Sequence, residues 1–220
     1  RRRSAILSLG NTGSGAQAAL EQLQAALRDE EPDVRAGAAS ALGNLGPGAA
    51  RAEPELRSAL ADKDPAVRRE AARAMGELGS AGQGSIPNLT RALHDEDPFV
   101  RAGAAAALGR LGGEAVRAAA ELAALLGDKE PAVRLSALRA LGEFGGAARD
   151  SIPDLVRALG DEEVPVRVEA ARTLGGLGRL AESSLAALEE ASGAPEPRAR
   201  SSAAEALEMV QAPSGENGEG

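Results

Sequence analysis

Residues 98–112 read Pro-Phe-Val-Arg-Ala-Gly-Ala-Ala-Ala-Ala-Leu-Gly-Arg-Leu-Gly, and close copies of this stretch recur along the chain. Its Arg returns every 33 residues, at Arg2, Arg35, Arg68, Arg101, Arg134, Arg167 and Arg200. Its first residue, Pro, keeps the same register at Pro32, Pro65, Pro98, Pro131 and Pro197, with Val164 in the one gap. An Asp series runs from Asp29 to Asp161, and two Gly series share the period. Self-similarity at a fixed period of this length indicates a repeat architecture.

The quoted stretch predicts a helix, which we call helix B of each repeat. Pro suits the first helical position because its φ is already helical and its missing N–H would have no partner there. In the first full repeat the apolar residues follow the three/four spacing of one helix face: Val34, Ala38, Ala41, Leu42 and Leu45. Gly46 and its equivalents then fit a left-handed C-terminal cap, which only Gly adopts at low cost.

A second helix, helix A, precedes helix B in each repeat and carries two Leu residues four positions apart. The pairs are Leu23 and Leu27, Leu56 and Leu60, Leu89 and Leu93, Leu122 and Leu126, and Leu155 and Leu159. One pair of helices cannot bury both of its apolar faces alone, so neighbouring pairs must stack to form a continuous core. The high content of Ala and Leu and the lack of strand-forming runs also favour an all-α fold.

The string Val-Arg-x-x-Ala-Ala-x-Ala-Leu-Gly-x-Leu-Gly, present from Val100 to Gly112, resembles HEAT repeats, specifically the bacterial phycobilin-lyase-type subclass. As in the HEAT pattern, the turn Asp lies six residues before the Arg of helix B. Helix A carries a Pro eight residues before that Asp, at Pro54, Pro87 and Pro153. The resemblance covers nearly the whole chain. It implies an α-solenoid, in which antiparallel helix pairs form a right-handed superhelix.

The period predicts one solenoid domain over residues 1–211 and a disordered tail over 212–220. The domain would contain a partial repeat at 1–13 and six repeats, at 14–46, 47–79, 80–112, 113–145, 146–178 and 179–211. The last repeat has Ala194, Glu208 and Gln211 in place of the Asp and both Gly residues, as suits a terminal repeat facing water. Because the chain begins inside a repeat without Met, we expect its natural N-terminus to lie upstream.

The Arg series is the most regular feature, and a structural role explains it best. A guanidinium can bridge two acceptors in a fixed fork, so a repeated Asp–Arg pair would fix the register of stacking. The resemblance implies the same role, and ligand binding stays the alternative. The expected ladder consists of Asp29, Arg35, Asp62, Arg68, Asp95, Arg101, Asp128, Arg134, Asp161 and Arg167.

Composition argues against several classes of partner and chemistry. The net charge is −8, which opposes binding to nucleic acid or anionic lipid. No apolar run approaches the ~20 residues of a membrane helix, and no Cys can form a disulfide or a thiolate metal site. We therefore expect neither a nucleic-acid nor a membrane partner. We also expect a cytoplasmic location, and the resemblance to the bacterial subclass implies a bacterial source.

Catalytic groups are scarce. His94 is the sole His and occupies a turn position, and no Ser has a His that could activate it. Carboxylate pairs recur in nearly every turn, which is typical of solvated helix starts rather than of a single catalytic pair. We predict no enzymatic activity, no catalytic residue, no metal site and no cofactor.

The outward face of helix B is the candidate binding surface, because in a solenoid these helices usually line the concave side. Outward positions should be 33, 37, 40 and 44 and their equivalents. Aromatic and Arg residues dominate interface energies most often. We predict a protein- or peptide-binding groove formed by Phe99, Ala106, Arg73, Arg110, Arg139 and Arg172. Alternatively, Phe99 folds back over the helix start as a staple-like contact.

A second candidate surface is acidic. The turns before helix B in five repeats hold thirteen Asp or Glu residues and two Lys residues. Such an edge either keeps the stack soluble or attracts a basic partner. Overall we expect a monomeric, non-catalytic scaffold that binds a protein or peptide. The alternatives are an accessory subunit of a phycobilin-lyase-like chromophore-attachment enzyme, which the resemblance implies, and a structural or designed repeat array.

Overall fold

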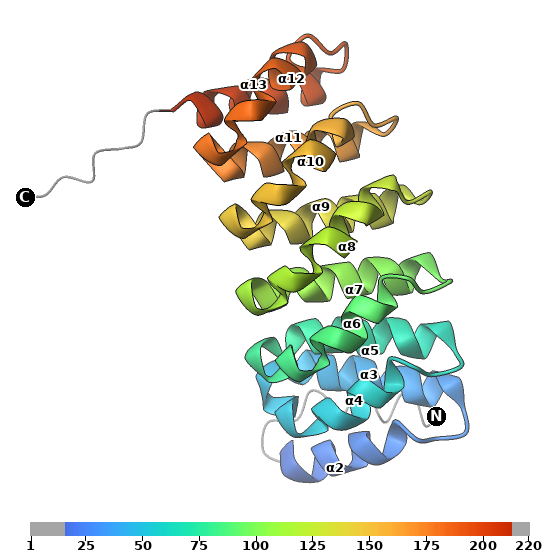
Figure 1. Cartoon of the computed structure of the whole chain (residues 1–220). Helices are drawn as coiled ribbons and strands as arrows, with labels where there is room; N and C mark the ends of the chain where they lie inside the picture. The colour runs from blue at the N-terminus through green and yellow to red at the C-terminus, as the bar shows by residue number, and fades with distance from the viewer. Residues whose placement is uncertain (1–15, 213–220) are drawn as a thin grey trace, which may run out of the picture. The chain divides into compact units, whose positions relative to one another are not determined.

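The structure is a computed structural model that describes residues 16–212 (Figure 1). All regular secondary structure within this range is helical and arranged in repeated pairs, which confirms the predicted all-α, α-solenoid fold. Contacts divide the chain into two compact units, Arg1–Glu121 (unit 1) and Leu122–Gly220 (unit 2). The expected partial repeat at 1–13 and residues 213–220 of the expected tail lie outside the described residues.

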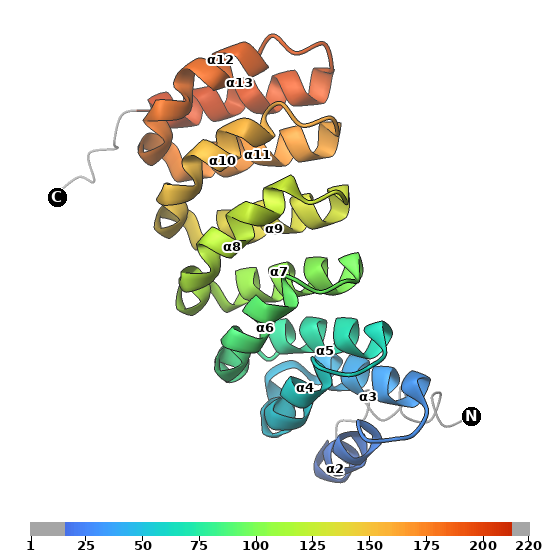
Figure 2. The same cartoon turned by 45° about the vertical axis from the view of Figure 1, so that its right-hand side comes forward.

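The described part of unit 1 contains three helix pairs, which follow one another in Figure 2. Its A helices are α2 (Ala16–Ala26), α4 (Glu53–Ala59) and α6 (Ile86–Ala92), and its B helices are α3 (Pro32–Leu45), α5 (Pro65–Glu77) and α7 (Pro98–Leu111). Short 3₁₀ helices lead from each B helix into the next A helix: η1 (Gly46–Ala52), η2 (Gly79–Ser85) and η3 (Gly112–Ala118). The first residues of α8 (Ala119–Ala124) complete the unit.

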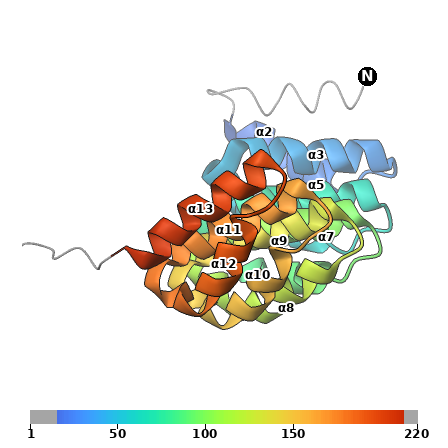
Figure 3. The ribbon, with the colours of Figure 1, turned by 90° about the horizontal axis from the view of Figure 1, so that it is seen from above.

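Unit 2 repeats the same arrangement. After the end of α8 come η4 (Leu125–Gly127), α9 (Pro131–Phe144), η5 (Gly145–Ser151), α10 (Ile152–Ala158), α11 (Val164–Leu177), η6 (Gly178–Ser184), α12 (Leu185–Ala191) and α13 (Pro197–Gln211). Figure 3 shows the A helices α10 and α12 on one side of this unit and the B helices α11 and α13 on the other. Each B helix of the unit packs against the next, so one face of the unit consists of B helices.

Every described B helix begins at the residue that the Pro series predicts. This holds for α11 as well, which starts at Val164 with Pro165 as its second residue. The preceding Asp caps two of these helices: Asp64 accepts a hydrogen bond from the N–H of Ala66, and Asp97 accepts from the N–H groups of Phe99 and Val100. These caps satisfy helix N–H groups that have no partner within the helix.

Glycine ends the B helices through a different conformation from the one expected. Gly46 has φ 55° and ψ −135°, and its equivalents in the later repeats also have positive φ. The positive φ agrees with the prediction, but ψ lies outside the left-handed helical region, so the left-handed cap was wrong. The backbone instead turns directly into a 3₁₀ helix through a region that essentially only Gly visits.

The second Gly series, which lies three residues before Gly46 and its equivalents, lets successive B helices approach closely. A Cβ on Gly76 would lie 2.9 Å from the Cα of Ala107, and one on Gly175 would lie 3.0 Å from the Cα of Ala206. Gly142 differs, because its neighbour on the next B helix is Thr173 and a Cβ there would come no closer than 3.6 Å. Thr173 breaks a series of Ala residues, and α9 and α11 leave more room at this point.

The Leu pairs of the A helices lie in the core, with one exception. Leu122 is fully buried, but Leu126 is only half-buried and Leu125 is buried in its place. The reason is local, since α8 ends at Ala124 and continues as the tighter 3₁₀ turn η4. A 3₁₀ turn rotates each residue further around the axis than an α-helix does, so the adjacent Leu faces inward.

Among residues 16–212, none of the helices combines the length and the apolar character that crossing a membrane requires.

Candidate protein-binding surface

Arg35 of the predicted ladder contacts two repeats of unit 1. Arg35 donates from Nη1 to the backbone carbonyls of Asp29 and Glu30 in its own turn, at 2.8 and 2.9 Å. Its Nε and Nη2 donate to both carboxylate oxygens of Asp62 in the next repeat, at 2.7 and 2.8 Å. Arg35 is buried, so a charge-assisted fork holds consecutive turns together in a largely dry setting.

The same contacts recur along each unit. Arg68 binds Asp95 through two bonds of 2.8 Å, and in unit 2 the Nη2 of Arg134 lies 2.8 Å from Asp161. Arg134 keeps one buried nitrogen, Nε, without a partner among the described residues. At the end of the chain Arg167 pairs with Glu196 at 2.8 Å, because Ala194 occupies the Asp position.

These contacts raise the pKa of three ladder arginines and lower the pKa of Asp62 and Asp95. The hydrogen bond to Asp62 raises the pKa of Arg35, and Asp95 and Asp161 raise the pKa of Arg68 and Arg134 in the same way. Burial alone would raise the pKa of Asp62, but hydrogen bonds from Arg35 and from the N–H of Asp64 hold that pKa below its usual value. Both partners therefore stay ionised at neutral pH.

The acidic turns are partly committed to the fold. The first Asp of each turn accepts a hydrogen bond from the N–H two residues later, as Asp62 does from Asp64 at 2.9 Å and Asp161 from Glu163 at 2.9 Å. Such Asx turns, together with the arginine bonds, use the oxygens that a basic partner would need. Glu96 and Glu162, which follow this Asp, remain exposed, with 88% and 79% of their side chains accessible.

The predicted groove residues of unit 1 lie on α5 and α7. Phe99 is 60% exposed at the start of α7, which disagrees with a staple-like contact that would cover the ring. Arg73 is tied down, because its Nη2 donates to the carbonyl and the hydroxyl of Ser40, both at 3.0 Å. Arg110 lies 3.5 Å from Glu77, and Ala106 is half-buried.

One of the positions expected to face outward is covered. Gly37 is buried, and its equivalent Gly103 is half-buried against α5, where an added Cβ would lie 3.7 Å from Ala72. This column of helix B therefore faces the preceding B helix rather than solvent.

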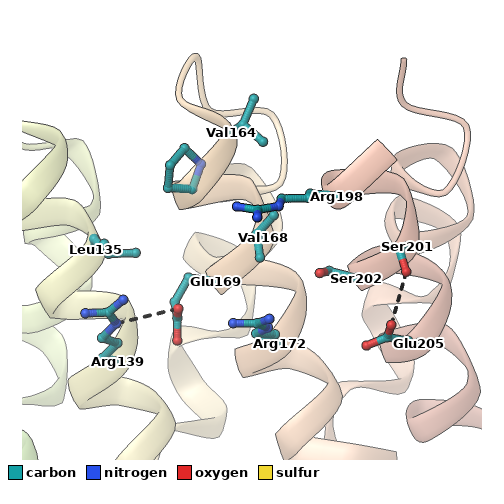
Figure 4. Close-up of a pocket in the computed structure, with 11 residues that line it drawn as sticks. Leu135, Arg139, Val164, Val168, Glu169, Arg172, Arg198, Ser201, Ser202 and Glu205 are labelled. Atoms are coloured by element: carbon teal, nitrogen blue, oxygen red, sulfur yellow. Dashed lines mark hydrogen bonds and ion pairs between the residues drawn. The ribbon is translucent and has the colours of Figure 1, made fainter. Parts of the chain in front are cut away.

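In unit 2 the predicted residues Arg139 and Arg172 line a common cavity of about 630 Å³ on α9, α11 and α13 (Figure 4). We call this cavity the helix B groove. Its remaining lining residues are Leu135, Val164, Pro165, Val168, Glu169, Arg198, Ser201, Ser202 and Glu205. Arg139 lies 3.6 Å from Glu169, and Ser201 donates a hydrogen bond of 3.1 Å to Glu205. The groove thus combines an aliphatic floor with three guanidinium groups.

A smaller cavity of about 180 Å³ shares Arg139, Glu169 and Arg172 with the groove. Gly142, Glu143, Thr173 and Gly176 complete its lining. It lies where Thr173 keeps α9 and α11 further apart, so the space on this face continues toward the C-terminal ends of the two helices.

Sequence reasoning missed several groove residues. Arg198 belongs to the same column as Phe99, and extending that column into the last repeat would have found it. Leu135 and Val168 lie in a column that was not counted as outward, although both are half-buried and line the groove. The signal for the extra space was Thr173, the one non-Ala residue at its position between Ala74 and Ala206.

His94, the only His in the sequence, is exposed in unit 1. Within the part of the chain that the structure describes, no three Asp, Glu or His side chains gather closely enough to hold a metal ion.

This stacking of helix pairs, tied within each unit by bonds from an arginine to a carboxylate of the next repeat, defines an α-solenoid. The model of the HEAT-repeat family matches residues 1–62, 23–86, 53–129 and 119–208, and the chain therefore belongs to the HEAT-repeat family. No curated protein sequence matches it significantly.

Solved structures support the same fold. An engineered protein has a TM-score of 0.69 at 23% identity, over 87% of this chain and 96% of its own. The complex of CpcE and CpcF of phycocyanin lyase from Nostoc sp. PCC7120 has a TM-score of 0.63 at 27% identity, over 87% and 76%. Computationally designed armadillo repeat proteins for modular peptide recognition have a TM-score of 0.67 at 20% identity, over 86% and 99%.

Proposed function

We propose that this chain is a non-catalytic scaffold that binds a segment of another protein on the surface of its B helices. The observation that carries the proposal is the helix B groove of unit 2, a hollow with aliphatic and arginine side chains. Phe99, Ala106, Arg73 and Arg110 are the proposed contacts in unit 1, and Arg139 and Arg172 are those in unit 2. Exposed aromatic and Arg side chains are typical anchors of protein interfaces.

Photo-crosslinking of the full chain tests this function. One variant carries p-benzoylphenylalanine in place of Ser201, an exposed residue that lines the groove. The matched control carries it in place of Ala186, an exposed residue on the A helix α12. We expect a discrete protein adduct in source cells from the groove position and none from the control. Equal adducts from both positions, or none from the groove, would contradict the proposal.

A second candidate is an accessory subunit of a chromophore-attachment enzyme. The observation that favours it is the 27% identity to the CpcE and CpcF complex over most of both chains. Addition of a bilin to the full chain, alone and with a candidate partner subunit, tests this role by absorbance. An unchanged bilin spectrum in both mixtures would count against it.

A further inference from the structure

The helix B groove of unit 2 contains two arginines that the described chain leaves without an anionic partner. Within residues 16–212, the guanidinium groups of Arg172 and Arg198 make no hydrogen bond or ion pair. The ladder arginines contrast with them, since Arg134 in the same unit is bonded to its own turn and to Asp161. A guanidinium offers up to five donors in a planar fork, which a carboxylate matches with two parallel bonds.

The groove is a positive site on an acidic chain. Three arginines line it against two glutamates, although the whole chain has a net charge of −8. Both glutamates already have neighbours, because Glu169 lies 3.6 Å from Arg139 and Glu205 accepts a hydrogen bond from Ser201. The lining therefore carries one net positive charge, and neither Arg172 nor Arg198 has a carboxylate partner among the described residues, so charge complementarity favours an anionic ligand.

The floor of the groove is aliphatic. Leu135, Val164 and Val168 are half-buried and Pro165 is exposed. Figure 4 shows Arg198 reaching from α13 toward Val168 of α11, with Arg172 one turn further along α11. An aliphatic side chain placed on Val168 would thus have a guanidinium group on either side.

The spacing of the two arginines fits an extended segment. Arg198 corresponds in register to Pro165, seven residues before Arg172. Idealised helix packing, with ~1.5 Å rise per residue and ~9 Å between axes, would place their Cα atoms about 14 Å apart, and the two guanidinium groups are closer because Arg198 reaches toward Val168. In an extended chain, residues four apart are separated by about 13 Å, and residues two apart face the same side.

We propose that the helix B groove of unit 2 binds an extended protein segment of the form acidic–x–aliphatic–x–acidic. Arg198 and Arg172 bind the two carboxylates, and Val168 and Leu135 receive the aliphatic side chain between them. This inference rests on the proposed scaffold function and adds the chemistry of the partner.

The test uses the full chain and fluorescent peptides with a fixed core and randomised flanks, measured by anisotropy at low salt. The core Glu-x-Leu-x-Glu is compared with Gln-x-Leu-x-Gln, Glu-x-Ser-x-Glu and Lys-x-Leu-x-Lys. We expect the first pool to bind at least about tenfold more tightly than the other pools and to weaken as salt rises. The double variant Arg172→Ala with Arg198→Ala should lose about tenfold in affinity.

The matched control removes two exposed arginines of unit 2 outside the groove, Arg149→Ala with Arg157→Ala, and should leave affinity within about twofold. Equal binding of the Glu and Gln pools, no binding of any pool, or an equal loss in both double variants would overturn the inference. So would tighter binding of a single-stranded oligonucleotide, or a dimer of the full chain that disappears in the groove variant. If the Ser201 adduct persists while the peptides fail, the scaffold function stands and only the proposed chemistry is wrong.

Discussion

Arg73 in unit 1 and Arg172 in unit 2 occupy the same position of helix B, three repeats apart, but their surroundings differ. Arg73 donates to Glu70 at 3.1 Å and to the carbonyl and hydroxyl of Ser40 at 3.0 Å, and about two thirds of its side chain is covered. Arg172 is exposed and has no such bond within the described residues. The same residue type in the same register is therefore bonded to neighbouring side chains and backbone in one unit and makes no hydrogen bond or ion pair with described residues in the other.

The cause lies one repeat earlier. The residue that precedes Arg73 by one repeat is Ser40, which supplies a hydroxyl acceptor beside its backbone carbonyl, whereas the residue that precedes Arg172 is Arg139, whose side chain has no acceptor. Arg139 also lies near Glu169, the equivalent of the Glu70 that holds Arg73. One substitution from Ser to Arg therefore removes two partners from the next arginine. The position within the repeat therefore determines where a side chain lies on helix B. The residues around it in the preceding repeat determine whether it forms hydrogen bonds within the protein.

The two phenylalanines extend this comparison and give the largest expected effect. Phe144 is buried in unit 2, and Phe144→Ala should lower the free energy of unfolding by about 3–5 kcal/mol, because it leaves a cavity. Phe99 in unit 1 is 60% exposed, so Phe99→Ala should cost about 1 kcal/mol or less. Urea denaturation measures both values. A loss of several kcal/mol for Phe99→Ala would show that the ring is covered, and would remove it from the candidate surface.

The ladder arginines give the next largest effect. Arg68→Met leaves Asp95 without the fork that compensates its charge in a site where only 12% of its side chain is exposed, so we expect a loss of about 3 kcal/mol. Arg200 holds the same register in the last repeat and is exposed, and among residues 16–212 it bonds only carbonyls of its own turn. Arg200→Met should therefore change stability by no more than about 0.5 kcal/mol. Similar losses of stability in both variants would mean that the bonds from the arginine to its own turn, rather than the bonds to Asp95, are responsible.

The pH dependence of the free energy of unfolding at acid pH provides the control for this prediction. Burial opposes ionisation of Asp95, but hydrogen bonds from Arg68 and from the N–H of Asp97 hold its pKa below the ordinary 3.8. Because the folded pKa is depressed, the stabilisation is complete above about pH 3.8 and is lost as pH falls through the lower, folded value. The difference in unfolding free energy between the wild type and Arg68→Met should therefore narrow below pH 3.8. A constant difference down to the folded pKa would argue that lost packing of the Arg stem is responsible.

The fold could be predicted from the sequence because the rules that determine it are local and repeated. Pro at the first helical position and the three/four spacing of apolar residues act within one helix, so even α11, which begins at Val164, starts at the expected residue. Where a second local effect intervened, the prediction failed. Because of the 3₁₀ turn η4, Leu125 rather than the predicted Leu126 lies in the core. Gly46 has the predicted positive φ but not the predicted left-handed helical ψ.

The candidate site could be predicted only in part. Its arginine column was visible, because Arg139 and Arg172 recur in register, but the pairing of their side chains was not. Glu169 could pair with Arg172 on its own helix or with Arg139 on the preceding B helix. The outcome depends on packing between repeats, which the period of the sequence does not specify. The smaller cavity beside the groove also depends on Thr173, a single departure whose effect on helix spacing appears only when two B helices are packed together.

The smallest expected effect comes from a variant of unit 2 that gives Arg172 the same surroundings as Arg73 has in unit 1. Arg139→Ser restores the hydroxyl that Ser40 provides to Arg73 and frees Glu169 for Arg172, three residues later on the same helix. In the Arg139→Ser background, Arg172→Ala should lower the free energy of unfolding by about 1 kcal/mol, the value of a few hydrogen bonds that compete with water. In the wild type, the same substitution should change the free energy of unfolding by no more than about 0.5 kcal/mol. A double-mutant cycle in urea measures this coupling. The same Arg139→Ser change should weaken binding of the Glu-x-Leu-x-Glu peptides, because an arginine committed to the fold no longer meets the ligand as a free cation. Absence of coupling together with unchanged affinity would show that the residue one repeat earlier does not decide the role of Arg172.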